Sequence, residues 1–193
     1  MKLDEDLWAQ HQYQVLVSFV HHLAYYWALK RCYDESRSKS EFWTRTIDAH
    51  LLRAIIDWCM VFGTDSSEIH WKKVTADHQA RSSFRRHLLS VIGLTREEWQ
   101  TYWSNMTTFR NNFAAHRIVA PVYPSVPNMD VALLAATAYD DWFRGSVAAS
   151  FGEPPLRARY DRLIRVSGRT FARLISAGPP LDAEYEGHPP RRT

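Results

Sequence analysis

Apolar side chains recur at every third or fourth position along the N-terminal part of the chain. The residues in this pattern are Leu16, Phe19, Val20, Leu23, Ala24 and Trp27. Such spacing lines one face of an α-helix, whereas a half-buried strand would alternate apolar and polar residues. The pattern predicts one long helix from about Asp4 to about Tyr33, with a face that must be buried against other helices.

Further segments with helical periodicity follow, separated by polar or proline-containing stretches. The clearest start signal is the capping-box pair Thr95 and Glu98, which precedes an apolar run. Ser38 and Glu41 form the same pattern, and Gly63 follows that helix as a C-terminal stop residue. The predicted helices after the first run from about 38 to 62, from about 77 to 92, from 95 to about 118, from about 129 to 149 and from 155 to about 176.

The composition agrees with an all-α fold. Hydrophobic residues make up 46% of the chain, and seven glycines in 193 residues leave little material for the tight turns of an all-β protein. We expect an up-and-down bundle of four to five long helices with short accessory helices. Residues 1–177 should form this single helical bundle domain, and the tail 178–193 has little to bury and is expected to be disordered.

The charge and the cysteines restrict partners and compartment. The net charge is +3, which permits an anionic partner without requiring one. Cys32 and Cys59 lack CxxC spacing, as expected in a reducing compartment. No apolar run is long enough for a membrane span, and the acidic N-terminus lacks the pattern of a secretory leader. These features predict a cytoplasmic protein without membrane contact.

The most unusual segment is TTFRNNFAAHRI, residues 107–118, on the fourth predicted helix. At 100° per residue, an apolar stripe centred near Met106 forms the core face of this helix. Arg110 then lies about 60° to one side of the stripe and His116 about 60° to the other. Both residues flank the core face, which suits a site at the edge of the bundle or at a dimer seam.

The residues RNNFAAH, 110–116, resemble the R-x(4–6)-H signature of the HEPN superfamily. The upstream block at 58–73, WCMVFGTDSSEIHWKK, is also similar to a segment of abortive-infection-type HEPN-like proteins. The resemblance implies a metal-independent endoribonuclease, often the toxin of a toxin-antitoxin or phage-defence system with an antitoxin protein as partner. It further implies a homodimer with facing motifs, in which Arg110 and His116 are the catalytic pair and Asn111 is a polar helper. Other members of the family bind RNA or nucleotides without cutting.

The chemistry of these side chains is compatible with RNA cleavage without a cofactor or metal. Histidine exchanges protons near neutral pH, so His116 is suited to act as base or acid. The guanidinium of Arg110 remains charged and matches phosphate oxygens. One histidine per chain is too few for two proton transfers, and a symmetric dimer would supply the second.

Basic residues elsewhere suggest an anionic ligand. On the last predicted helix, arginines recur at three- and four-residue steps: Arg162, Arg165, Arg169 and Arg173. This stripe is suited to contact RNA phosphates, although a solvated basic face is an equally good interpretation. A smaller cluster of Arg81, Arg85 and Arg86 leaves the same two possibilities.

Two alternatives to the nuclease remain open. The motifs E-x-x-H and H-E-x-x-H are absent, but scattered histidines can still assemble a three-histidine metal site in space. Their positions are His11, His21, His22, His50, His70, His78, His87 and His116. The second alternative is a non-catalytic helical module that binds RNA, nucleotides or another protein, in which Arg110 and His116 only close a bundle edge or dimer seam.

Overall fold

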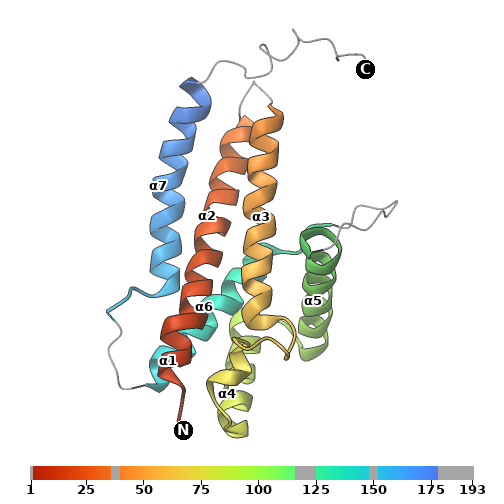
Figure 1. Ribbon diagram of the computed structural model, residues 1–193, viewed down its shortest axis with the longest axis vertical. Coiled ribbons are helices and arrows are strands. Elements are labelled where there is room, and N and C mark those ends of the chain that lie inside the picture. Colours follow the sequence, from red (N-terminus) through yellow and green to blue (C-terminus); the bar gives the residue numbers. More distant parts are fainter. Residues whose placement is uncertain (1, 36–39, 116–124, 148–151, 178–193) are drawn as a thin grey trace, which may run out of the picture.

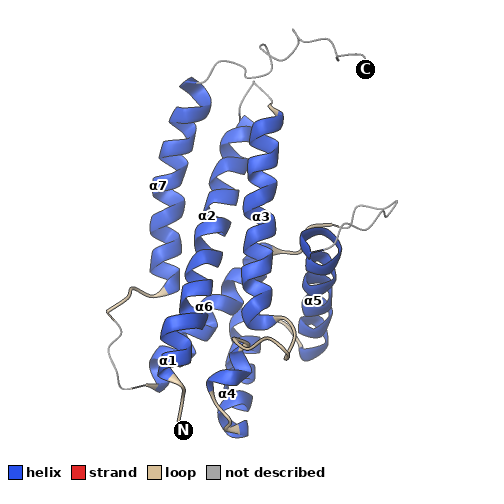
Figure 2. Cartoon of the chain, in the orientation of Figure 1, coloured by secondary structure: helices blue, strands red, loops and turns tan. Residues whose placement is uncertain are grey.

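The computed structural model describes residues 2–35, 40–115, 125–147 and 152–177, and within these residues every regular element is helical (Figures 1 and 2). The α-helices are α1 (Glu5–Leu7), α2 (Tyr13–Glu35), α3 (Glu41–Phe62), α4 (His78–Ile92), α5 (Arg96–Phe109), α6 (Met129–Ser146) and α7 (Leu156–Ala177). Two π-helical segments, η1 (Trp8–Gln12) and η3 (Arg110–Ala115), and one 3-10 turn, η2 (Trp71–Val74), complete the structure. The predicted all-α helical bundle is therefore confirmed.

The three longest helices lie side by side along the long axis of the molecule (Figure 1). Helix α2 is in the middle and packs against α3 on one side and α7 on the other. Helix α4 packs against α6, and η3 at the end of α5 packs against α3. The fully buried side chains of Trp58 on α3, Phe84 on α4 and Tyr139 on α6 belong to one core that these helices share.

The predicted long N-terminal helix is present, but a π-helical segment precedes its main α-helical part. The predicted apolar face of α2 is buried, including Leu16, Phe19 and Leu23. Before α2, the chain winds as the π-helix η1. There the ring of Trp8 stacks on Phe143 of α6, with centroids 4.4 Å apart and planes at 3°. This stack ties the first turns of the chain to the core.

The capping signals locate some helix starts correctly. Thr95 and Glu98 form the predicted capping box of α5, and Gly93 ends α4 with a φ of 67°. Helix α3, however, begins at Glu41 with Ser40 as its N-cap, so the prediction of Ser38 as the cap was wrong. A capping box is a short pattern that can occur by chance. The residue directly before the first turn of α3 is Ser40, which is a serine like Ser38.

The C-terminal helices follow the predicted ranges closely. Helix α6 ends at Ser146 rather than near Ala149, and α7 begins at Leu156. The predicted tail 178–193 lies outside the described residues. None of the described helices has an apolar stretch long enough to cross a membrane.

Candidate functional site

The segment that resembles the HEPN motif is not a regular α-helix. Residues Arg110–Ala115 form the π-helix η3, which continues α5 with wider turns. The prediction of a single α-helix to about Ile118 was therefore wrong at residue 110. A π-turn closes with i→i+5 hydrogen bonds, so angles calculated at 100° per residue do not apply across the motif.

Arg110 begins η3 and is half-buried. Its Nε atom is buried and has no hydrogen-bond partner among the described residues. The guanidinium lies close enough to Cys59 of α3 to favour the thiolate, although burial dominates and raises the pKa of Cys59 to about 12. Arg110 is therefore partly enclosed by the bundle, with its Nε atom shielded from solvent.

Of the other two residues of the predicted site, Asn111 alone is among the described residues. Asn111 is exposed to solvent. His116 lies outside the described residues, so its distance from Arg110 is not part of this structure. Arg110 is not among the residues that line any of the three grooves described for this chain.

The arginine stripe of α7 is present on the surface. Arg162, Arg165, Arg169 and Arg173 are all exposed. Among the described residues none of the four has a carboxylate within 4.0 Å, whereas Arg157 and Arg159 of the same helix are paired with Asp161 and Glu153. The opposite face of α7 packs on the core through partly buried residues that include Leu163 and Phe171.

Two of the scattered histidines, His22 and His50, form a pair. Within the described ranges, no three His, Cys, Asp or Glu side chains are placed to hold a metal ion. His22 of α2 and His50 of α3 nevertheless meet, with their Nδ1 atoms 2.8 Å apart. One Nδ1 must donate and the other accept, so the hydrogen bond requires at least one of the two imidazoles to be neutral.

This pair should make stability depend on pH. Burial lowers the pKa values of His22 and His50, and lowers that of His70 to about 4, while the nearby carboxylate of Asp57 opposes the shift at His22. In the unfolded chain these imidazoles take up protons near pH 6.5. The unfolded state then binds more protons than the folded state, so stability is lost as the pH falls below about 6.5.

We expect the urea midpoint to fall between pH 7 and pH 5.5, where most carboxylates remain ionised. The double variant His22→Asn/His50→Asn carries amides that do not titrate, and its midpoint should change less over the same range. Equal changes in the wild type and the double variant would rule out a contribution of the pair.

A groove of about 760 Å³ lies among α4, α5 and the loop that follows α3. We call it the basic groove because four cationic side chains and one carboxylate line it: Lys72, Arg85, Arg86, Arg96 and Asp65. Three tryptophans, Trp71, Trp99 and Trp103, are also part of its lining. Arg81 belongs to the predicted arginine cluster but not to the groove, since its Nε donates to the carbonyl of Thr75 at 2.8 Å.

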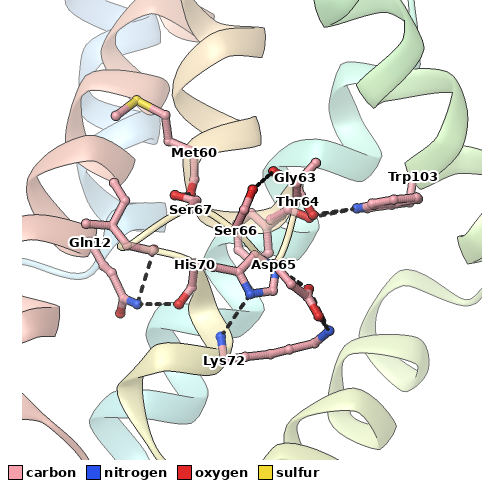
Figure 3. A network of polar contacts seen from close by, with 12 residues as sticks. Gln12, Met60, Gly63, Thr64, Asp65, Ser66, Ser67, His70, Lys72 and Trp103 are labelled. Carbon is pink, nitrogen blue, oxygen red and sulfur yellow. Dashed lines mark hydrogen bonds and ion pairs between the residues drawn. The ribbon is translucent and has the colours of Figure 1, made fainter.

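One side of the basic groove is held by a polar network (Figure 3). Lys72 Nζ bonds both carboxylate oxygens of Asp65 at 2.7 and 2.6 Å, and this contact lowers the pKa of Asp65. The Nδ1 of buried His70 accepts from the backbone N–H of Lys72, and its Nε2 lies 3.5 Å from Asp65. Since Nδ1 is the acceptor, His70 is neutral with its proton on Nε2, which faces the carboxylate.

The same loop is fastened to the rest of the bundle. Gln12 of η1 donates to the carbonyls of Ile69 and His70 at 3.3 and 3.0 Å, and accepts from Tyr139 at 2.6 Å. Trp103 of α5 donates to the carbonyls of Phe62 and Gly63 at 2.8 and 3.1 Å (Figure 3). Side chains from η1, α5 and α6 therefore fix the loop at the groove.

The sequence predicted a cluster that contains Arg85 and Arg86, but not that Arg96, Lys72 and the three tryptophans line the same groove. A local signal existed, since Arg96, Trp99 and Trp103 follow one another at helical spacing. The partners in α4 and in the loop after α3 are distant along the chain, and only the packing of α4 beside α5 shows that they share one groove. His70 and Trp71 are both buried, with ring centroids 5.7 Å apart.

A scan against protein-family models, a search of curated proteins and a search of solved structures each found no match to this chain.

Proposed function

We propose that this protein is a metal-independent endoribonuclease of the HEPN type, in which Arg110 and His116 cleave RNA at the cleft of a homodimer. The observation that carries the proposal is the unusual backbone of the motif itself. The resemblance begins at Arg110, and so does a π-helix, a rare conformation that is frequent at functional sites. The buried Nε of Arg110 has no partner among the described residues, and such an atom calls for an explanation that a catalytic role would supply.

The roles follow from the chemistry of the three side chains. Arg110 would stabilise the negative charge that develops on the phosphorus-bound oxygens, and its planar guanidinium can bond two of them. His116 would take the 2′-hydroxyl proton or protonate the leaving oxygen, with the partner chain's histidine in the complementary role. Exposed Asn111 would orient the scissile phosphate. The exposed arginine stripe of α7 would bind the RNA backbone outside the cleft.

A physiological role as the toxin of a toxin-antitoxin or phage-defence system, held inactive by an antitoxin protein, is part of the same proposal. It depends on the resemblance of RNNFAAH to the HEPN signature.

The test is cleavage of a mixed RNA substrate by purified protein in EDTA. We expect the wild type to cut RNA under these conditions and His116→Ala to lose the activity. The variant Asn105→Ala, with an exposed residue of α5 that has no assigned role here, serves as the matched control and should cleave normally. Cleavage that is equal in the wild type and His116→Ala would refute the catalytic assignment.

A non-catalytic RNA-binding module is the second candidate, and the burial of Arg110 favours it. A guanidinium whose Nε is buried needs a rearrangement before that atom can reach a phosphate. In this case the wild type would bind RNA in a salt-dependent manner without cutting it. The combined variant Arg165→Gln/Arg169→Gln should then reduce the binding.

A further inference from the structure

The basic groove has more positive charge than its own carboxylate can neutralise. Asp65 is engaged by Lys72 at 2.6 Å. Within the described residues, Arg85, Arg86 and Arg96 have no carboxylate within 4.0 Å. All three are exposed and come from two helices that line the same groove. Such a concentration of guanidinium groups favours an anionic ligand.

Flat aromatic surfaces adjoin these charges. The guanidinium of Arg85 lies over the ring of Trp71, 5.4 Å from its centroid. Trp99 and Trp103 are partly buried and form further lining on the α5 side. A ligand that carries both a negative group and a flat ring therefore finds complementary partners in the same groove.

The loop side of the lining is held in place by hydrogen bonds within the chain. Trp103 is held by two carbonyls at the end of α3, and His70 is held by Gln12 and by the backbone of Lys72. These bonds fix the loop that carries Asp65 and Lys72 (Figure 3). A preformed site loses less entropy on binding than one that must be ordered.

The volume of the groove suits a small-molecule ligand. Its volume of about 760 Å³ lies within the range of ligand pockets, which is about 300–1,000 Å³. A phosphate monoester carries more charge than a carboxylate, and its three terminal oxygens can accept hydrogen bonds from several guanidinium groups. We propose that the basic groove is a binding site for a small organic phosphate with a flat ring, whose phosphate contacts Arg85, Arg86 and Arg96 and whose ring packs on Trp99.

This site is separate from the motif at Arg110, and its proposal does not depend on ribonuclease activity. The variant Arg110→Met should bind the small phosphate as the wild type does. Failure of one proposal is thus distinguishable from failure of the other.

The experiment is isothermal titration calorimetry of the full chain with four probes: adenosine 5′-monophosphate, adenosine, ribose 5-phosphate and inorganic phosphate. We expect saturable binding of adenosine 5′-monophosphate and at least about tenfold weaker binding of adenosine, because the nucleoside has no phosphate for the arginines. Ribose 5-phosphate and inorganic phosphate should bind more weakly than the monophosphate, because neither has an aromatic ring.

Two variants locate the site. Arg85→Gln/Arg86→Gln should weaken binding of adenosine 5′-monophosphate at least about tenfold, since both charge-assisted contacts are lost. Trp99→Leu should weaken binding of the monophosphate but leave ribose 5-phosphate unchanged. The matched control is Lys30→Gln/Arg45→Gln, which removes the same charge from exposed ion pairs outside the groove and should bind normally. Circular dichroism melts would show that each variant is folded.

Three results would overturn the proposal. The first is a lack of saturable binding by every phosphate probe. The second is equal weakening in the control double variant, which would mean attraction by net charge alone. The third is binding of adenosine as tight as that of its monophosphate, which would leave the arginines without a role.

Discussion

Replacing Asp140 by alanine should destabilise the protein by about 3–5 kcal/mol, as expected when one partner of a buried ion pair is removed. Asp140 is only 1% exposed, and its two carboxylate oxygens have different partners. One accepts from Nε of Arg144 at 2.8 Å, and the other accepts from the backbone N–H of Leu156 at 2.8 Å. Asp140 on α6 therefore caps the start of α7.

The loss should extend beyond a single contact. Arg144 also donates to the carbonyl of Glu153 at 3.0 Å and lies over the rings of Trp8 and Tyr13. Without Asp140, the mostly buried Arg144 would lose the charge-assisted bond from its Nε, and the buried N–H of Leu156 would lose its acceptor. Burial raises the pKa of Asp140 despite these partners, which indicates that the pair does not recover the full cost of desolvation.

Urea denaturation at pH 7 checks this prediction, with Asp161→Ala as the matched control. Asp161 is also paired with an arginine, Arg157 of the preceding turn, but the two side chains are 40% and 55% exposed, so its removal should cost less than about 1 kcal/mol. Asp140→Asn keeps an acceptor for Leu156 and should be intermediate. A similar loss for Asp140→Ala and Asp161→Ala would show that the link between α6 and α7 is not important for stability.

The second large effect should follow substitution of Arg110 by methionine, which should reduce RNA cleavage by about 10²–10³-fold, the range observed when a single group that stabilises transition-state charge is removed. The same variant should melt at the wild-type temperature or higher. The unbranched methionine side chain would keep most of the apolar contact with α3 while removing the buried Nε that lacks a partner among the described residues.

The cleavage rate and the melting temperature of Arg110→Met together distinguish a catalytic role from a structural one. A residue that only supports the fold should lower the melting temperature when it is replaced, whereas a catalytic residue should affect cleavage alone. RNA cleavage in EDTA and a thermal melt on the same preparation provide both readings. A variant that melts well below the wild type and retains its activity would assign Arg110 a structural role.

Much of the secondary structure could be predicted from local patterns. The apolar spacing before Trp27 located α2, and the Thr95–Glu98 pair located the start of α5. The cap of α3 was misplaced because two serines lie within three residues, and Ser40 is the N-cap by its backbone conformation, without a side-chain cap bond that a capping-box pattern could predict. The π-helices η1 and η3 were not predicted, since apolar periodicity near 3.6 residues does not distinguish a local change to wider turns.

The candidate sites differ in how much the sequence contributes. The exposed arginines of α7 follow from their spacing on one amphipathic helix. The arginines of the basic groove were visible only as separate clusters. The pair of His22 and His50 and the cap by Asp140 were not predicted, because their partners lie 28 and 16 residues away along the chain.

The all-α class, the approximate ranges of the long helices and the basic face of α7 were predictable from the sequence, because they depend on side-chain spacing within single helices. Three features became visible only in the folded chain: the buried Nε of Arg110, the basic groove lined by α4, α5 and three tryptophans, and the link that Asp140 makes between two helices. These features depend on how helices pack, and packing is governed by contacts between residues that are distant in sequence.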